Sequence, residues 1–82
     1  MKTNGIRFFV SPVHGGGYLV EKIQDYKVVE SFRGSTLTPD EVAKHLQDKG
    51  LSNISILKCR IADYFTRTGI KDTFDSQKYN QK

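Results

Sequence analysis

The chain has 82 residues, of which 37% are hydrophobic and 27% are charged, and its formal net charge is +4. This length allows one domain, and the composition is too apolar for a disordered polyelectrolyte and too polar for a bundle of membrane spans. In the first twenty residues the longest apolar run is Phe8-Phe9-Val10, which is too short for a signal peptide. We therefore expect a small cytoplasmic domain without a membrane partner.

The first part of the chain predicts an antiparallel meander of three strands. Residues 6–13 place β-branched and aromatic side chains on both faces of a pleat, as a strand does. The glycines at 15–17 reach positive φ at little cost, which favours a hairpin turn. Residues 18–23 and 26–33 are two further β-prone runs, separated by a short polar link.

The register of the second hairpin is open. A loop at Asp25-Tyr26 would place Ile23 opposite Val28, which suits both side chains. The same loop would place Glu21 opposite Glu30, and two like charges in direct opposition destabilise a strand pair. A longer loop would relieve this clash, so the sequence allows both arrangements.

Local signals predict a helix from Pro39 to Lys49. Thr38 is suited to cap its N-terminus, and Glu41 follows three residues later as the second member of a capping box. Gly50 is suited to the left-handed position that ends a helix. The apolar stripe expected to cover one face of the sheet consists of Val42, Ala43 and Leu46.

The rest of the chain has weaker patterns. Residues 53–59 are rich in β-compatible apolar side chains and predict a fourth strand that returns to the sheet. Residues 61–67 favour a short helix, with an extension of that strand as the alternative. The polar residues 71–82 predict a flexible tail after a single domain at 1–70.

These elements together predict an α+β fold. Its sheet is antiparallel with three to four strands, and the element order is β-β-β-α-β. One capped helix packs on one face of the sheet, and a short C-terminal helix is an optional addition.

No residue pattern indicates an enzyme. The run His14-Gly15-Gly16-Gly17 matches the letters of the oxyanion loop in some lipases and esterases. That chemistry also needs a G-x-S-x-G nucleophile turn, which the sequence lacks. His14, His45 and the single Cys59 have no partners at metal-ligand spacing, so we expect neither a metal nor a cofactor.

Basic and aromatic side chains are concentrated towards the C-terminus. Residues 58–82 hold six basic side chains against three acidic ones. Cations neutralise phosphates and aromatic rings stack unpaired bases, so this mixture favours a nucleic-acid surface. The residues that we expect to bind nucleic acid or another partner are Lys58, Arg60, Tyr64, Arg67 and Lys71.

A second candidate surface lies on the predicted sheet. Its residues are Arg7, Phe9, Tyr18, Lys22, Tyr26, Lys27 and Arg33. Exposed aromatic side chains of this kind favour docking on a protein. The sequence thus supports two hypotheses: a non-enzymatic protein that binds nucleic acid or a nucleoprotein complex, or an inhibitor or adaptor that docks on a protein target. The oligomeric state is left open.

Two resemblances accompany these hypotheses. The β-β-β-α order over residues 6–50 resembles the arm-type DNA-binding domains of tyrosine recombinases, in which a three-stranded sheet enters the major groove. The small size and the lack of a catalytic set resemble the inhibitors encoded by phages and mobile elements, anti-CRISPR proteins among them. The first resemblance implies DNA binding, although the predicted fourth strand departs from that plan, and the second implies occupation of a protein surface.

Overall fold

The computed structural model describes residues 5–67 and 69–79. Its elements, in chain order, are β1 (Ile6–Pro12), β2 (Tyr18–Gln24), β3 (Lys27–Gly34), α1 (Pro39–Asp48), α2 (Ile54–Thr66), β4 (Asp72–Asp75) and α3 (Ser76–Tyr79). None of the described helices is both long and apolar enough to cross a membrane.

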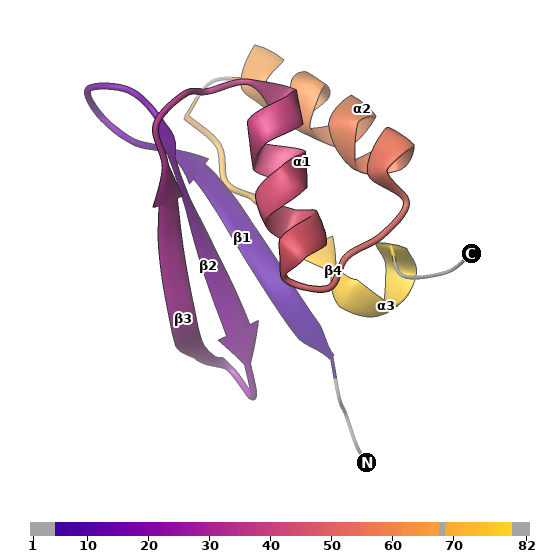
Figure 1. Ribbon diagram of the computed structural model, residues 1–82. Helices are drawn as coiled ribbons and strands as arrows, with labels where there is room; N and C mark the ends of the chain where they lie inside the picture. Colours follow the sequence, from indigo (N-terminus) through magenta and orange to yellow (C-terminus); the bar gives the residue numbers. More distant parts are fainter. Residues whose placement is uncertain (1–4, 68, 80–82) are drawn as a thin grey trace.

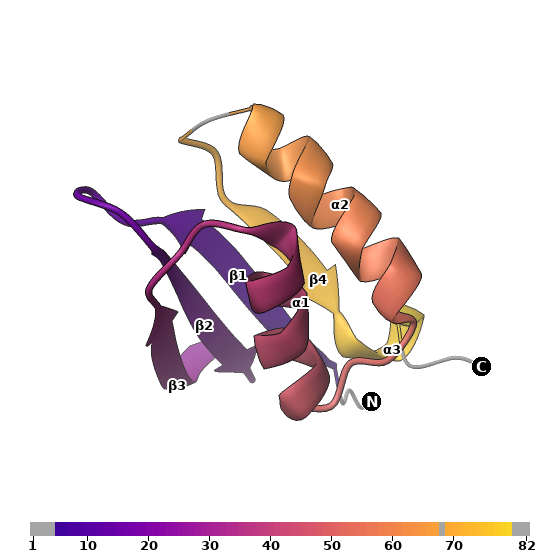
Figure 2. The same cartoon turned by 45° about the horizontal axis from the view of Figure 1, so that its top comes forward.

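The four strands form one antiparallel sheet in the order β3-β2-β1-β4. Helices α1 and α2 lie beside each other on one face of this sheet, and no described element covers the other face (Figure 1 and Figure 2). The predicted α+β class, the antiparallel sheet and the order β-β-β-α-β are confirmed, with a second long helix inserted before the last strand.

The core lies between the two helices and the sheet. Its side chains alternate along the strands and recur at helical spacing along α1 and α2, and they include the whole predicted apolar stripe of α1. The buried residues are Phe8, Val10, Tyr18, Val20, Val42, Ala43, Leu46, Leu51, Leu57, Ile61, Tyr64, Phe74 and Tyr79.

The glycine loop between β1 and β2 forms the predicted hairpin. The Gly16 N–H donates to the Val13 carbonyl at 3.0 Å, and the Val13 N–H donates to the Gly17 carbonyl at 3.2 Å. Gly15, Gly16 and Gly17 all have positive φ. Residues other than glycine rarely adopt positive φ at three successive positions, so these glycines determine where the chain reverses.

The second hairpin resolves the register that the sequence left open. Its turn is the short one, Asp25-Tyr26, and Ile23 lies opposite Val28 as that loop predicts. A β-bulge then shifts the pairing by one residue, so that Glu30 lies opposite Lys22 instead of Glu21. The bulge therefore replaces a like-charge pair with an acid–base pair without lengthening the loop.

Helix α1 begins at the predicted residue, and its caps explain both ends. The Glu41 N–H donates to the Thr38 hydroxyl at 3.2 Å, whereas the Glu41 carboxylate accepts from the Thr36 N–H at 2.9 Å and does not close a full capping box. At the other end the N–H groups of Gly50 and Leu51 donate to the carbonyls of Gln47 and Leu46. This Schellman arrangement ends the helix at Asp48, one residue before the prediction.

The prediction of a strand at residues 53–59 is wrong, because residues 54–59 form the first half of α2 and Asn53 is its N-cap. Leu57, Ile61 and Tyr64 are buried at helical spacing, so one face of α2 completes the core. The helix predicted at 61–67 is the second half of the same element, which ends at Thr66. The fourth strand of the sheet is instead β4, which lies later in the sequence than predicted and pairs with β1.

The chain also differs from the flexible tail predicted for residues 71–82. Residues 72–75 form β4 and residues 76–79 form α3, and the side chains of Phe74 and Tyr79 are buried in the core. The Ser52 N–H and hydroxyl both donate to the Tyr79 carbonyl, at 3.1 and 2.9 Å. These contacts make residues 72–79 part of the folded unit, while residues 80–82 lie outside the described residues.

Tyr18 links β2 to α1 through the core. Its ring packs directly on Gly34 of β3, where an added Cβ would overlap the ring. Its hydroxyl is hydrogen-bonded to Nδ1 of His45 at 2.7 Å, and the His45 ring also meets Phe32 edge-on. Gly34 is therefore required for the Tyr18 ring to reach its position.

We predict that Gly34→Ala lowers the free energy of unfolding by about 2 to 3 kcal/mol, because the Tyr18 ring must move and its hydrogen bond to His45 is lost. The melting temperature measured by circular dichroism should fall by roughly 10 °C. Gly5→Ala is the control, because a Cβ at Gly5 meets no atom within 4 Å. Equal stability of the two variants would contradict this role of Gly34.

The buried tyrosines differ in how their hydroxyl groups are satisfied. The Tyr64 hydroxyl is buried and has no hydrogen-bond partner among the described residues, in contrast to that of Tyr18. Burial raises the pKa of Tyr18 to about 12, with a further contribution from Glu41. Burial also raises the pKa of Tyr64 to about 12, with a further contribution from Asp72.

These two environments predict different effects on stability when the hydroxyl is removed. Tyr64→Phe should not lower stability at neutral pH, whereas Tyr18→Phe should cost about 1 kcal/mol through its lost hydrogen bond. Because each folded-state pKa lies above the unfolded value of 10.0, unfolded tyrosines release protons first and stability should fall as pH rises from 10 to 12. Each variant should lose less stability than wild type over this range in thermal melts. A larger loss for Tyr64→Phe than for Tyr18→Phe at neutral pH would refute the assignment.

Candidate interaction surface

The C-terminal basic residues predicted to bind nucleic acid are engaged in ion pairs. Three of the four pairs connect α2 to α1, α2 to β4, and the segment before β4 to β2, and the fourth joins two residues at the end of α2. They are Lys58 with Asp40 at 3.1 Å, Arg60 with Asp72 at 2.7 Å, Arg67 with Asp63 at 3.5 Å, and Lys71 with Glu21 at 2.9 Å. A carboxylate therefore accompanies each cation, which reduces the positive field that this surface offers to phosphates.

The aromatic residues of the same region belong to the core. Tyr64 is buried, and its ring lies 5.4 Å from that of Phe65. The Arg60 guanidinium lies over the ring of Phe74, with 5.4 Å to the ring centroid. Because the rings of Tyr64 and Phe74 are covered, they present no face on which a base could stack.

The uncovered face of the sheet presents a different combination of residues. Phe8, Val10, Val20 and Phe74 point towards the helices, so the residues that alternate with them point away. We call the surface made by these residues the open face. Its apolar residues are Phe9, Leu19, Ile23 and Val28, and its charged strand residues are Arg7, Glu21, Arg33 and Asp75.

The apolar residues of the open face form a band across three neighbouring strands. Phe9, Leu19 and Ile23 are half-buried by their neighbours on the sheet, and Val28 is 52% exposed. Lys71 reaches this band, because its Nζ lies 5.2 Å from the centroid of the Phe9 ring while it pairs with Glu21. Lys71 is thus the one residue of the C-terminal set that the structure shows on the open face.

The residues predicted for the sheet surface divide between its two faces. Arg7, Phe9 and Arg33 lie on the open face, and Tyr26 lies in the turn beside it. The prediction that Tyr18 is exposed is wrong, because this side chain is buried against α1. Lys22 and Lys27 also point to the helix side, since they pair with residues of that face.

Three apolar members of the open face are absent from the residues predicted for either surface, and these are Leu19, Ile23 and Val28. The signal for them is alternation, because Leu19 and Ile23 stand out of phase with Tyr18 and Val20 on the same strand. Only the register of the buried face shows which of the two sets points outwards.

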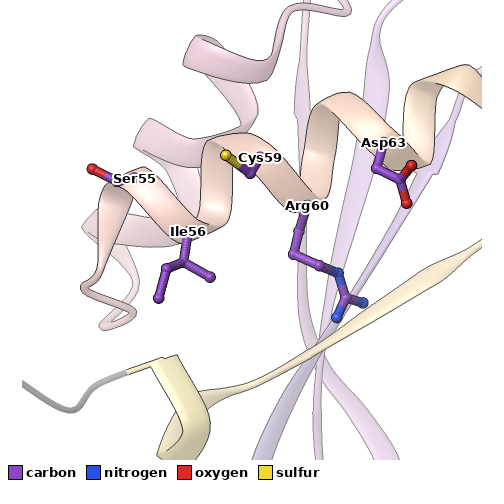
Figure 3. Close-up of a pocket in the computed structure, with 5 residues that line it drawn as sticks. All are labelled: Ser55, Ile56, Cys59, Arg60 and Asp63. Atoms are coloured by element: carbon purple, nitrogen blue, oxygen red, sulfur yellow. The ribbon is translucent and has the colours of Figure 1, made fainter.

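Two hollows on the surface of the described residues bear on these candidate surfaces. One, of about 460 Å³, lies at the turn end of the open face and is lined by Gly5, Arg7, Phe9, Ile23, Asp25, Tyr26 and Asp75. The other, of about 390 Å³, runs along the outer side of α2, where Ile56 and Arg60 extend from the same side of the helix (Figure 3). In the second hollow Arg60 is engaged by Asp72, and the thiol of Cys59 is free and exposed. Neither hollow gathers three metal-ligating side chains among the described residues.

Tyr26 lies at the rim of the first hollow and has an unusual backbone conformation. It has a φ of 65°, in the left-handed region that bulky residues rarely adopt, and its side chain is fully exposed. Asp25, with a φ of 56°, completes a two-residue turn in which glycine is the favoured second residue. The tyrosine therefore adds strain to the turn without adding contacts to the core.

We predict that Tyr26→Gly raises the melting temperature by about 2 to 5 °C, because glycine adopts this φ without strain. Tyr26→Ala is the matched control, since it removes the exposed ring but keeps the Cβ that causes the strain. Its melting temperature should stay close to that of wild type in thermal unfolding followed by circular dichroism. If Tyr26→Gly is no more stable than Tyr26→Ala, the turn holds no strain of this kind.

Comparison of the chain with protein-family models, with curated proteins and with solved structures found no match. The resemblances in element order to recombinase arm domains and in size to small phage inhibitors gain no support from these comparisons.

Proposed function

We propose that the chain is a non-enzymatic binding protein that docks the open face of its sheet on another protein. The observation that carries this proposal is the band of Phe9, Leu19, Ile23 and Val28, which crosses three strands and has none of the described helices over it. Burial of such side chains against a partner is favourable by roughly 25 cal/mol per Å². An apolar centre with arginine and tyrosine at its border is the usual composition of a protein interface.

The charges around this band favour a protein over a nucleic acid. The basic residues at the open face and its border are Arg7, Arg33 and Lys71, and the acidic residues are Glu21, Asp25 and Asp75. This balance gives no net positive field to attract phosphates, whereas it suits a protein surface with mixed charges. Together with the paired cations on α2, it makes protein docking the better supported of the two hypotheses.

The chain would then act as an inhibitor or adaptor, by occupying a surface of its target. The free thiol of Cys59 is compatible with action in the reducing cytoplasm, which is where we place it.

Affinity capture with matched variants tests this proposal. The full chain is immobilised in a lysate of its source cells, and partners are quantified by mass spectrometry for wild type, Ile23→Glu and Ile56→Glu. Both substitutions place a carboxylate on an exposed or half-exposed isoleucine, but Ile56 lies on α2, away from the open face. We expect a partner that wild type and Ile56→Glu retain and that Ile23→Glu loses by about tenfold or more, which is about 1.4 kcal/mol.

Fluorescence anisotropy with labelled single-stranded DNA, duplex DNA and RNA tests the competing hypothesis. A balanced open face should give no binding of micromolar strength at about 50 mM salt. Micromolar binding that weakens about tenfold by 200 mM salt would overturn the proposal in favour of a nucleic-acid surface. Retention of every captured protein by Ile23→Glu would also overturn it.

A further inference from the structure

Strand β3 ends the sheet with an unpaired edge. It is the longest described strand, with eight residues, and β2 is its only neighbour in the sheet (Figure 1). Its side chains are mostly exposed, and Val28 and Val29 are 52% and 54% exposed. The backbone N–H and carbonyl groups along such an edge are available to pair with another strand.

The bulge in β3 determines which side chains share a face at this edge. In a regular strand Lys27 and Glu30, three residues apart, would point to opposite faces. Here Lys27 lies opposite Gln24 and Glu30 lies opposite Lys22, and both of these β2 residues point to the helix side. The extra residue at Val28-Val29 therefore brings Lys27 and Glu30 onto one face, with the two valines between them.

This arrangement makes the edge complementary to itself. Side chains that lie directly opposite in an antiparallel pair point to the same face, so only residues of one face can be matched. Arg33 lies opposite Leu19 on the open face and cannot face Glu30 of another copy. The single register that brings opposite charges together therefore sets Lys27 against Glu30 of the second copy, twice by symmetry.

We propose that two copies of the chain pair through residues 27–30 of β3 in this register, as a two-fold symmetric dimer in which the edges of the two sheets meet at the bulge. The valines 28 and 29 of both copies lie at the two-fold axis, and a Lys27–Glu30 pair flanks them on each side. Glu30 is already held by Lys49 of its own chain at 2.9 Å, and this contact lowers the pKa of its carboxyl, so it is ionised at neutral pH. Lys27 has no ion pair among the described residues, so its ammonium is available to the second copy.

Antiparallel pairing of the two β3 edges leaves both open faces on the same side of the sheet, so the dimer would double the area that the proposed docking face offers to a partner. The dimer rests on the edge of β3 and not on the proposed function, so its failure would leave the docking of a single open face to be tested separately.

Sedimentation equilibrium of the purified chain over a range of concentrations tests the dimer. Wild type should show a reversible monomer–dimer equilibrium. Lys27→Glu and Glu30→Lys each place like charges opposite each other twice, so each should weaken the dimer by about tenfold or more. Arg33→Glu is the matched control, because it changes the same charge on the same strand but on the other face, and it should leave the equilibrium unchanged.

Mixing the two disruptive variants gives the decisive measurement. A copy with Lys27→Glu and a copy with Glu30→Lys are complementary at both charged positions, so their mixture should form a heterodimer of about wild-type strength. Circular dichroism of each variant alone confirms that it is folded. The proposal is overturned if wild type stays monomeric at every concentration, if Lys27→Glu leaves its dimer intact, or if the mixture fails to associate while both variants are folded. A dimer that dissociates with Ile23→Glu but not with Lys27→Glu would also overturn it, because the open face would then be the contact.

Discussion

The packing of α1 and α2 on a single face of the sheet is the constraint on which the rest of this structure depends. A chain of 82 residues supplies two amphipathic helices of useful length, and both are used to bury the side of the sheet that carries Phe8, Val10 and Val20. No described element remains to cover the opposite side. The apolar band on the open face is therefore a direct result of how the fold distributes its elements. A binding partner would remove this apolar surface from water, which is favourable.

The same constraint gives the basic residues of α2 a structural role. Helix α2 offers only a narrow apolar face, so its position over β4 and beside α1 is also supported by ion pairs such as Arg60 with Asp72 and Lys58 with Asp40. The Asp72 side chain is largely buried, and this makes its pair with Arg60 more than a solvated surface contact. A cluster of positive charge in a sequence therefore says little about nucleic acid until the positions of the carboxylates are known.

The elements that the sequence predicts correctly are those whose signals are local. Helix α1 could be predicted because its caps, its proline and its apolar stripe all lie within the segment itself. The strand prediction for the first half of α2 is wrong because its isoleucines suit either element, and its burial at helical spacing depends on packing against the rest of the fold. Strand β4 was missed because only Phe74 of its four residues is buried, and the strand exists through its pairing with β1. The division of the surface residues between the two faces, with Tyr18 inside and Phe9 outside, required the same long-range information.

The bulge in β3 affects both the strand pairing inside the chain and the proposed pairing between two chains. The sequence shows the like-charge clash between Glu21 and Glu30 and suggests a longer loop as its relief, whereas the structure relieves it with an inserted residue in the strand. The insertion keeps the tight turn with its strained Tyr26 and moves Glu30 next to Lys22. It also places Lys27 and Glu30 on one face, so relief of a clash inside the chain and complementarity between two chains have the same geometric origin. A regular β3 would satisfy neither requirement, because Glu30 would then face Glu21 and point away from Lys27.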